Sequence, residues 1–424
     1  MAIDRREFIK WMSATAGLAA VGGCATTGGE GAAGRVVVIG GGYGGATAAK
    51  FIRMWAPDIG VTLVERNSEF VSCPISNLVL GGNTQMSTIT MGYAGLRKHG
   101  VQVVRGEAVG VDAAKREVRL AGGQTLPYDR LVVSPGIDFI PGAIPGLKSA
   151  DAQARILHAW KAGPQTVALR KQLEALRNGG VYVLHMPVAP YRCPPGPYER
   201  VCQVADYLKK AKPRSKIIML DSNPDIVSKK GLFLAAWKGM YKGMIDYRPN
   251  SELQDVDARS QTAILLGDKV QGDVLNIVPP HGAGDIARRA GLITANNRWC
   301  GIDWRTMEST AVPGVHVLGD ATLSAPGMPK SASITNQHAK VCAAAVISLI
   351  RGQPVNQDTM MMNTCYSFVS GTSAMHVASV HRYDPAQKTI VPVKGAGGIS
   401  TAASEAEAAY AWGWAKNIWA EALA

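Results

Sequence analysis

The stretch Val36-Val37-Val38-Ile39-Gly40-Gly41-Gly42-Tyr43-Gly44-Gly45 decides the fold. A short β-branched run stops at Gly40, and glycines at positions 40, 42 and 45 lead into a segment, 46–55, that reads as a helix. Gly40 permits a tight turn, Gly42 lets backbone approach a pyrophosphate, and Gly45 lets helix and strand pack closely. This order predicts a dinucleotide-binding unit whose phosphates face the helix N-terminus.

A second apolar run, 61–64, ends in Glu65, about 20 residues after Gly45. A carboxylate at this spacing is where a ribose hydroxyl needs an acceptor. Arg66 follows directly, and we include it in the predicted site. A chance glycine turn would not bring a second strand and an acidic residue at the right distance.

Two later segments indicate which dinucleotide binds. The strand 128–133 runs into Ser-Pro-Gly, with Pro135 and Gly136 at a second point of backbone approach, and the strand 314–318 ends in Gly319-Asp320. Asp320 is the type of residue that accepts hydrogen bonds from the ribityl hydroxyls of a flavin. Because a nicotinamide domain does not need this late Gly-Asp strand, the combination favours FAD.

Two further residues belong to the predicted FAD site. Val109 lies in the segment 108–112, which leads into an alternating hairpin region of the kind inserted in flavoprotein nucleotide domains. Lys330 precedes a long helical segment, 333–350, whose N-terminal dipole would stabilise an anionic reduced flavin. The alternative is that Lys330 is a surface residue and that the helix only packs.

A second unit, 147–285, has the strand and helix order of a nucleotide domain without its glycine turn. His185-Met186-Pro187-Val188-Ala189-Pro190 follows its first strand, and neither prolines nor bulky side chains let backbone cradle a pyrophosphate. We therefore predict that this unit does not bind NAD. Asp221, which ends its next strand, is then expected to be a turn or cap residue.

The composition suits a globular protein of two or three domains, with 424 residues and 47% hydrophobic content. The formal net charge of +13 favours anionic ligands or an acidic partner. No basic cluster with interleaved aromatic residues indicates nucleic acid. The seven cysteines form no C-x-x-C pair, so we expect no metal site.

The amino terminus predicts export. Arg5-Arg6, followed by Phe8 and Lys10, resembles a twin-arginine signal, and the apolar run 11–23 is too short to span a membrane. We expect a periplasmic protein exported after it has acquired its cofactor. The residues before Cys24 also resemble a lipoprotein cleavage box, so a lipid on Cys24 is the one membrane attachment considered, with an ordinary signal peptidase site as the alternative.

Two cysteines stand in unusual settings. Cys193 lies in a proline-rich turn that enters a helix, where Arg192 and Arg200 are expected to lower its pKa, and Cys365 lies in a short polar stretch between domains. Cys202, Cys300 and Cys342 read as ordinary core residues. On the final helix, from about 404, an aromatic and apolar stripe is interpreted as core, with a partner interface or a position near the flavin as alternatives: Tyr410, Trp414 and Ile418.

Together these residues resemble the flavoprotein subunit of flavocytochrome c sulfide dehydrogenase. The most selective motif is Arg192-Cys193-Pro194-Pro195-Gly196-Pro197-Tyr198-Glu199-Arg200, and the others are the glycine loop, Cys73, Gly319-Asp320-Ala321, Met328-Pro329-Lys330-Ser331 and Asn363-Thr364-Cys365-Tyr366-Ser367. The resemblance implies an α/β fold with two Rossmann-like nucleotide-binding domains of the glutathione reductase type and a C-terminal α+β interface domain. The expected division is a signal and linker over 1–33, a split FAD domain over 34–146 and 286–358, a degenerate NAD-type domain over 147–285, and the interface domain over 359–424.

The resemblance also implies the chemistry. Cys73 matches the cysteine that forms a thioether to the flavin, Cys193 and Cys365 match a redox-active disulfide, and Glu199 matches a carboxylate near the substrate pocket. The implied substrate is hydrosulfide and the implied partner is a c-type cytochrome subunit, which holds the only haem. Two alternatives stay open: an enzyme that passes electrons to quinone, and a non-catalytic FAD-binding partner of a sulfur-oxidation complex.

Overall fold

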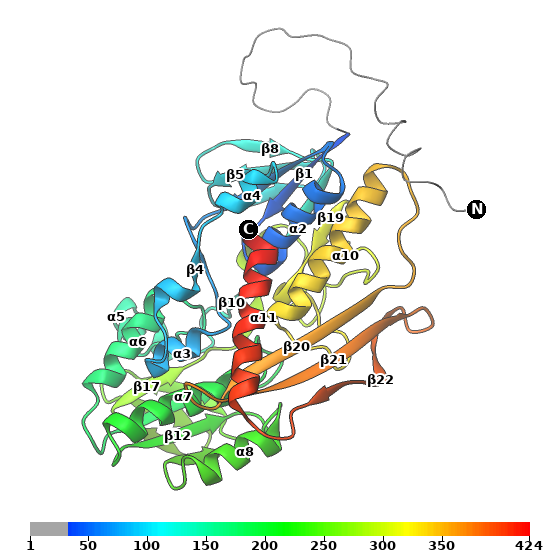
Figure 1. Ribbon diagram of the computed structural model, residues 1–424. Coiled ribbons are helices and arrows are strands. Elements are labelled where there is room, and N and C mark those ends of the chain that lie inside the picture. The colour runs from blue at the N-terminus through cyan, green and yellow to red at the C-terminus, as the bar shows by residue number, and fades with distance from the viewer. Residues whose placement is uncertain (1–32) are drawn as a thin grey trace.

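The computed structural model describes residues 33–424, and the predictions for Arg5, Arg6 and Cys24 lie outside these residues. A parallel five-stranded sheet carries the glycine loop (Figure 1). Its strands, in spatial order, are β19 (Val315–Val317), β9 (Arg130–Val133), β1 (Gly34–Ile39), β2 (Ile59–Glu65) and β5 (Gln102–Arg105). Val36, Val37 and Val38 are all buried, as expected for a parallel strand covered on both faces.

Helices α2 (Tyr43–Trp55) and α10 (Ala332–Ile350) pack against each other beside this sheet. Helix α2 begins at Tyr43, three residues before the predicted start, because the glycine loop itself forms the first turn. Helix α10 begins one residue before its predicted start, and the Ser331 hydroxyl caps it by accepting a hydrogen bond from the Ile334 N–H.

Short elements lie around the first sheet and between it and the central unit, where α3 (Ser76–Gly81) packs against α6 (Pro164–Ala175) and α7 (Gly196–Ala211). They are β3 (Phe70–Val71), β4 (Thr90–Met91), β6 (Ala108–Asp112), β7 (Glu117–Leu120), β8 (Thr125–Pro127), β10 (Ile137–Phe139), β18 (His281–Ala283), α3 (Ser76–Gly81), α4 (Ala94–Lys98), α5 (Ala150–Arg155), α9 (Asp285–Arg289) and the 3-10 turns at 86–89, 145–147 and 319–321. Strands β6, β7 and β8 form the predicted inserted antiparallel sheet.

A second parallel sheet lies in the central part of the chain. Its strand order is β13 (Ile245–Arg248), β12 (Lys216–Asp221), β11 (Val181–Met186) and β17 (Val274–Ile277). Around it lie α6 (Pro164–Ala175), α7 (Gly196–Ala211), α8 (Lys230–Gly239), β14 (Leu253–Asp257), β15 (Thr262–Leu265) and β16 (Lys269–Gln271). Two parallel sheets with helical connections confirm the predicted α/β class with two Rossmann-like units.

The C-terminal segment forms a long antiparallel sheet and a helix. They are β20 (Met360–Phe368), β21 (Ala374–Asp384), β22 (Thr389–Ile399) and α11 (Glu405–Leu423). In Figure 1 the red helix α11 runs from this sheet toward the blue helix α2, and α11 contacts α2, β20 and β21. The three sheets follow the predicted division of the chain, whose domain boundaries themselves stay a prediction.

The predicted stripe on the last helix is only partly core. Ile418 is buried and Trp414 is half-buried, but Tyr410 is 62% exposed, because the buried face of α11 is made by alanines such as Ala411 and Ala415. No helix within 33–424 has the length and apolar character needed to cross a membrane.

Candidate flavin and dithiol site

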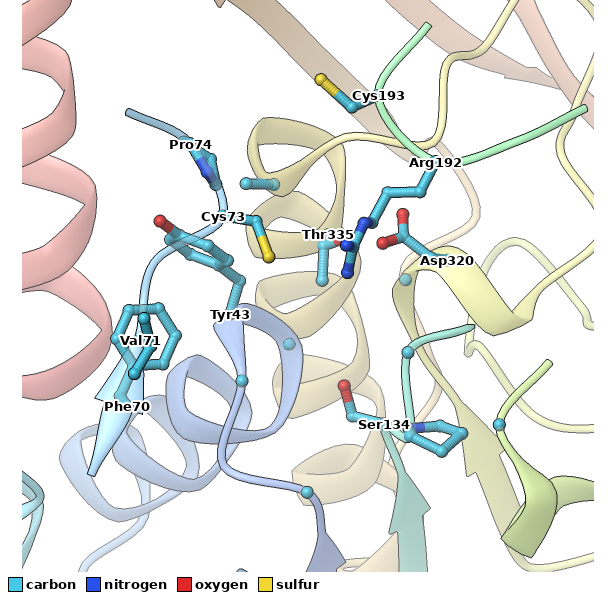
Figure 2. Close-up of a pocket in the computed structure, with 18 of the residues that line it drawn as sticks. Tyr43, Phe70, Val71, Cys73, Pro74, Ser134, Arg192, Cys193, Asp320 and Thr335 are labelled. Carbon is cyan, nitrogen blue, oxygen red and sulfur yellow. The ribbon is translucent and has the colours of Figure 1, made fainter. Parts of the chain in front are cut away.

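A cavity of about 390 Å³ is lined by residues of the first parallel sheet, of the turn and helix α7 in the central unit, and of the C-terminal sheet. Its wall comes from the glycine loop, the loop after β2, the proline-rich turn before α7, the start of α10 and strand β20. Figure 2 shows Cys73 beside Tyr43 and Thr335, and Arg192 extending toward Asp320. Most residues predicted from separate motifs therefore share one cavity.

The glycine loop is shaped for a ligand. Gly40 has a φ of +96°, and a Cβ there would lie 2.3 Å from the Ser134 carbonyl oxygen, so only glycine fits. A Cβ on Gly45 would lie 1.9 Å from the Gly40 carbonyl oxygen, which makes Gly45 a packing residue that does not line the cavity. Gly42 lines the cavity, and a Cβ on it would meet nothing within 4 Å. The space above Gly42 is the cradle that a side chain would fill.

Glu65 supports the same loop. Its carboxylate accepts a hydrogen bond from the Gly41 N–H at 2.7 Å and another from the Asn67 N–H at 2.7 Å, and it lines the cavity. Arg66 also lines the cavity, with its side chain largely exposed and 3.9 Å from the Glu107 carboxylate. Both therefore line the cavity, and the role of Glu65 as acceptor for a ribose hydroxyl stays a prediction.

Pro135 and Gly136 line the cavity as predicted, but Val109 does not. The wall is formed instead by Ala108 and Glu107, just before it. Ala108 pairs with Leu120 and Gly110 pairs with Arg119, so Val109 is the extra residue of a β-bulge, where the regular alternation of side chains is interrupted. The cavity-facing residue of β6 is therefore Ala108.

Asp320 carries the second ligand signal. Its Oδ1 is buried and has no hydrogen-bond partner among residues 33–424, although it lines the cavity, and burial raises its pKa. An orphaned buried acceptor is costly, so a ligand with hydroxyl donors would relieve it. With the Gly42 cradle, this oxygen shows that the residues present fit FAD.

Lys330 is a buried residue, which contradicts its reading as a surface lysine. Its ammonium donates to the carbonyl oxygen of Asp320 at 3.1 Å and also to that of Thr322, and it lies 3.7 Å from the centroid of the Trp299 ring. Burial lowers its pKa to about 8. Lys330 therefore places a positive charge directly behind Asp320, at the side of the cavity next to α10.

Cys73 lies in the loop between β3 and α3, half-buried in the cavity wall. Its Sγ is 3.5 Å from the backbone nitrogen of Ala162, which donates to it. Next to it the Tyr43 hydroxyl is 2.6 Å from the Ser72 hydroxyl and accepts a hydrogen bond from Trp419 of α11. The C-terminal helix thus braces the loop that presents Cys73.

Cys193 and Cys365 line the same cavity from different parts of the fold. Cys193 has a positive φ of 60° in the turn before α7, and its N–H donates to the Lys330 carbonyl oxygen. Cys365 lies within β20, where the sequence predicted a polar stretch between domains. No disulfide joins the six cysteines of residues 33–424, so the Cys193–Cys365 bridge stays a prediction.

The expectation of a lowered pKa for Cys193 is wrong, although Arg192 does act in the lowering direction. Burial raises this pKa well above its ordinary value, and the neighbouring Cys365 and Glu199 raise it further. Arg192 and Lys229 act in the opposite direction but with smaller effect. Burial raises the pKa of Cys365 as well. The desolvation of the Cys193 thiol therefore affects its pKa more than the positive charge of the neighbouring arginine does.

Glu199 lies in the first turn of α7 and lines the cavity together with Cys193 and Cys365. Its carboxylate accepts hydrogen bonds from the Phe368 N–H at 2.8 Å and from the Asn77 amide at 2.7 Å, and it forms no salt bridge with Arg200. Burial raises its pKa, although both hydrogen bonds and Lys229 oppose the rise. A buried carboxyl with a raised pKa beside two thiols keeps its proton to higher pH than an exposed glutamate and can transfer that proton within the site.

Asp221, at the end of strand β12 of the central sheet, is held by hydrogen bonds from neighbouring side chains. Asp221 is fully buried and accepts hydrogen bonds from the hydroxyls of Tyr198 and Tyr247 at 2.8 and 3.1 Å, and from both nitrogens of Asn223. The prediction that Asp221 is a structural residue is confirmed. Cys202, Cys300 and Cys342 are fully buried core residues, also as predicted.

Sequence reasoning missed two polar residues of the site. Asn77 donates to Glu199 and accepts from the Arg200 guanidinium at 3.1 Å, which joins the Cys73 loop to α7. Lys229 is 5% exposed and donates to the Cys365 carbonyl oxygen at 2.7 Å. Neither residue stands in a recognisable motif, because only the tertiary fold brings them to the cysteines.

Family models match most of the chain. One described as "Sulfide dehydrogenase (flavocytochrome c) flavoprotein chain, central" matches residues 166–279, and one described as "Flavocytochrome c sulphide dehydrogenase, flavin-binding" matches 357–423. A third, "Pyridine nucleotide-disulphide oxidoreductase", matches 34–169. The first two cover the segments that carry Cys193, Glu199 and Cys365.

Individual proteins are similar over shorter or more distant matches. The chain is 60% identical over 45 residues to a "Sulfide dehydrogenase (flavocytochrome c) flavoprotein chain" of Chlorobaculum thiosulfatiphilum, covering 11% of this chain and 94% of that sequence. It is 23% identical over 297 residues to the mitochondrial sulfide:quinone oxidoreductase of Mus musculus, covering 68% of this chain and 65%, just under two thirds, of the mouse protein. The solved sulfide:quinone oxidoreductase of Aquifex aeolicus shares the fold, with a TM-score of 0.76, 20% identity and coverage of 92% and 91%.

Proposed function

Because this chain belongs to the flavoprotein-chain family of flavocytochrome c sulfide dehydrogenase, a family of sulfide-oxidising flavoproteins, we propose that it oxidises sulfide to sulfur or polysulfide through a Cys193–Cys365 disulfide and passes the electrons to a c-type cytochrome. The observation that carries this proposal is the placement of both cysteines in the cavity that fits FAD. They reach it from the turn before α7 and from β20, which are far apart in the sequence.

The first step is thiol–disulfide exchange. Hydrosulfide attacks one sulfur of the bridge, so that one S–S bond forms as another breaks, leaving a persulfide on one cysteine and a thiolate on the other. The incoming sulfur gives up two electrons, which are held by the cleaved bridge. FAD, when bound, takes up two electrons together and releases them singly, as a haem acceptor requires.

Glu199 has the position and the raised pKa of a proton carrier for this exchange. Hydrosulfide brings a proton into a buried site, and the thiolate that leaves needs one. Glu199 is tied by its Phe368 hydrogen bond to the strand that carries Cys365, and it belongs to the helix that follows Cys193. We assign it the transfer of this proton between the sulfurs and the solvent.

Cys73 is the residue that we propose to hold FAD covalently. It faces the cavity from the loop after β3, with its sulfur half-buried and free. In this proposal the central domain takes no NAD. Prolines stand where a nucleotide-binding turn would have glycines, and the Asp221 carboxylate already accepts hydrogen bonds from two tyrosine hydroxyls. Reducing equivalents then enter only through the cysteine pair.

The proposed setting is the periplasm. The twin-arginine-like start supports export of the folded protein, and a lipid on Cys24 would be its one membrane attachment. A c-type cytochrome subunit is the proposed partner and holds the haem. The net charge of +13 suits an acidic partner surface.

The decisive experiment adds sulfide anaerobically to the FAD-loaded protein with its bridge oxidised. We expect the flavin absorbance to bleach, and Cys193→Ser or Cys365→Ser to abolish bleaching while FAD stays attached. Cys342→Ala, a buried cysteine in α10 away from the cavity, is the matched control and should bleach normally. A flavin that stays oxidised in the wild-type protein would contradict the enzyme proposal and favour a non-catalytic FAD-binding partner.

The competing function is a sulfide:quinone oxidoreductase-like enzyme. It is favoured by the match to such enzymes over three quarters of this chain, as for the Dictyostelium discoideum protein at 23% identity over 76% of the chain. Parallel assays of cytochrome c and of a short-chain quinone as acceptor separate the two. Faster turnover with quinone would overturn the cytochrome assignment and leave sulfide oxidation intact.

A further inference from the structure

A buried lysine stands behind the cysteine pair. Lys229 precedes helix α8 and is 5% exposed, with its ammonium group donating to the Cys365 carbonyl oxygen at 2.7 Å. Burying an ammonium group is costly unless nearby groups make use of its charge. A single hydrogen bond to a carbonyl oxygen does not offset the desolvation of an ammonium group, so negatively charged groups are expected nearby.

The backbone at Lys229 supports a specific role. It adopts the left-handed conformation, with φ 54° and ψ 34°, which costs a non-glycine residue roughly 1–2 kcal/mol. Such strain persists where the surrounding structure fixes it, often at functional sites. Here the preceding loop is fixed by the Tyr198 hydroxyl, which accepts a hydrogen bond from the Val227 N–H, and by the Asp225–Lys230 ion pair.

The neighbouring charges show what the ammonium group serves. The ionisable groups that face the two sulfurs are Arg192, Glu199, Arg200, Lys229 and Tyr191. Lys229 lowers the pKa of Cys193, of Cys365 and of Glu199. For Cys365 it is the main influence that opposes burial, whereas Arg192 acts on Cys193 and Arg200 acts on Glu199. Lys229 is the cation shared by all three groups.

We propose that Lys229 is a positioning residue of the dithiol site: its buried ammonium group holds the backbone of β20 at Cys365 and supplies the positive charge that stabilises negative sulfur on the cysteine pair. The proposal rests on the proposed function, since it gives the thiolate formed in sulfide attack its counter-charge. It also assigns a role to a residue that reaches the site from the central domain, across the boundary with the C-terminal sheet.

The neighbouring lysine provides a matched control. Lys230 is the next residue, but its side chain is 54% exposed and paired with Asp225. Removing its charge changes the same helix start and the same net charge without touching Cys365. A difference between the two positions therefore reports the buried charge.

The test measures thiolate formation without sulfide turnover. The FAD-loaded protein is reduced, freed of reductant and treated with iodoacetamide over a range of pH, and carboxamidomethylation of Cys193 and Cys365 is followed by peptide mass spectrometry. We expect Lys229→Met to shift the alkylation midpoint of Cys365 upward by about one pH unit, which is about tenfold slower reaction at a fixed lower pH. Lys230→Met should match the wild type, and Lys229→Arg should recover most of the rate.

Lys229→Gln separates charge from packing, because it keeps a hydrogen-bond donor while losing the charge. It should react as slowly as Lys229→Met, and a wild-type profile for Lys229→Gln would overturn the proposal, as would equal profiles for the methionine variants at 229 and 230. The flavin spectrum and the unfolding midpoint of each variant report its folding. Failure of sulfide to bleach the wild-type flavin would overturn the proposed function instead, whatever the alkylation result.

Discussion

Asp320 has one carboxylate oxygen that accepts no hydrogen bond from the described residues. Its Oδ1 is buried and unpartnered within residues 33–424, while Lys330 sits behind it on two carbonyl oxygens. A buried acceptor without a donor costs roughly 1–3 kcal/mol. A ligand hydroxyl at this point would recover that free energy, so the residue is poised for binding rather than for stability.

Replacement of Asp320 should therefore weaken FAD binding. In a Cys73→Ser background, where FAD is held without a covalent bond, we expect Asp320→Ala to raise the dissociation constant by about 10- to 100-fold, corresponding to one or two charged hydrogen bonds. Asp320→Asn keeps an acceptor oxygen and should lose less. Fluorescence titration of the apoprotein with FAD measures both, and equal affinities for the three proteins would contradict the assignment.

Glu199 makes the stability of the protein depend on pH in a defined direction. Its pKa is raised by burial, so the folded state keeps the proton to higher pH than the unfolded chain does. Its stabilising contribution is complete below the unfolded pKa and is lost as pH rises through the raised pKa, at about 1.4 kcal/mol per unit of elevation. The window of loss therefore begins near the ordinary value of glutamic acid and extends upward.

Glu199→Gln removes this titration. Relative to wild type, its free energy of unfolding should increase steadily as pH rises from about 4 through that window. Urea denaturation of both proteins across this range measures the difference, and every other ionisable group is common to the pair. A difference that stays constant with pH would show that Glu199 keeps an ordinary pKa.

Among the elements, the glycine loop shows how much the sequence could predict. The order strand, turn, helix and the spacing to Glu65 predicted β1, α2 and β2, because local geometry forces glycine at positive φ and at close backbone approach. The sequence did not predict that Cys365 lies within β20, since a polar strand paired on one side has no strong alternation. Nor did it predict that Ala108 and not Val109 lines the cavity, because the register shift between Ala108 and Gly110 depends on pairing with β7.

Two glycines of the loop should respond differently to alanine. Gly42→Ala meets no atom within 4 Å, so we expect a normally folded protein whose Cβ occupies the pyrophosphate cradle and lowers FAD content severalfold. Gly45→Ala would bring its Cβ to 1.9 Å from the Gly40 carbonyl oxygen, so we expect a loss of stability of at least about 2 kcal/mol. Thermal unfolding and the flavin-to-protein absorbance ratio give the two readouts. A stable Gly45→Ala protein with full flavin would contradict this division of roles.

For the whole molecule, the cavity is a product of long-range assembly. Its wall is built from residues between Ile39 and Trp414, contributed by the first parallel sheet, by the turn and helix α7 of the central unit, and by the C-terminal sheet and helix. Sequence motifs indicated which residues carry the chemistry. The burial that this assembly produces raises the pKa of Cys193, which is opposite to the direction inferred from the nearby arginines. Lys229 escaped notice for the same reason: its partner is 136 positions away in the chain.

The overall charge should govern the encounter with the electron acceptor. Residues 1–32 contain equal numbers of acidic and basic residues, so the described part of the chain carries the whole net charge of +13. The rate constant for reducing an acidic c-type cytochrome should fall about tenfold between roughly 10 and 200 mM salt. With a basic cytochrome the rate should rise with salt. Stopped-flow kinetics measures both, and the absence of any salt dependence would show that net charge does not steer the encounter.

The mass of the denatured mature protein tests two covalent predictions together. A flavin-sized increment that disappears in Cys73→Ser would establish the attachment, and a lipid-sized increment would place an acyl chain on Cys24. The unmodified mass, with FAD lost on denaturation, would contradict covalent attachment and leave the cavity assignment unaffected.

The buried Asp221 has a consequence for any redesign of the central domain. Its carboxylate is held by Tyr198, Tyr247 and Asn223, in the position where a nucleotide domain would offer an acid to a ribose. Glycines at positions 187 and 189 would not by themselves create a ribose site there. Releasing Asp221 would leave the hydroxyls of two buried tyrosines without a hydrogen-bond acceptor. Removing one of these tyrosines alone would leave the buried carboxylate beside an empty space. Several simultaneous changes would be needed, each harmful alone. A single substitution would therefore not turn Asp221 into a ribose acceptor, because its carboxylate already holds Tyr198, Tyr247 and Asn223 in place.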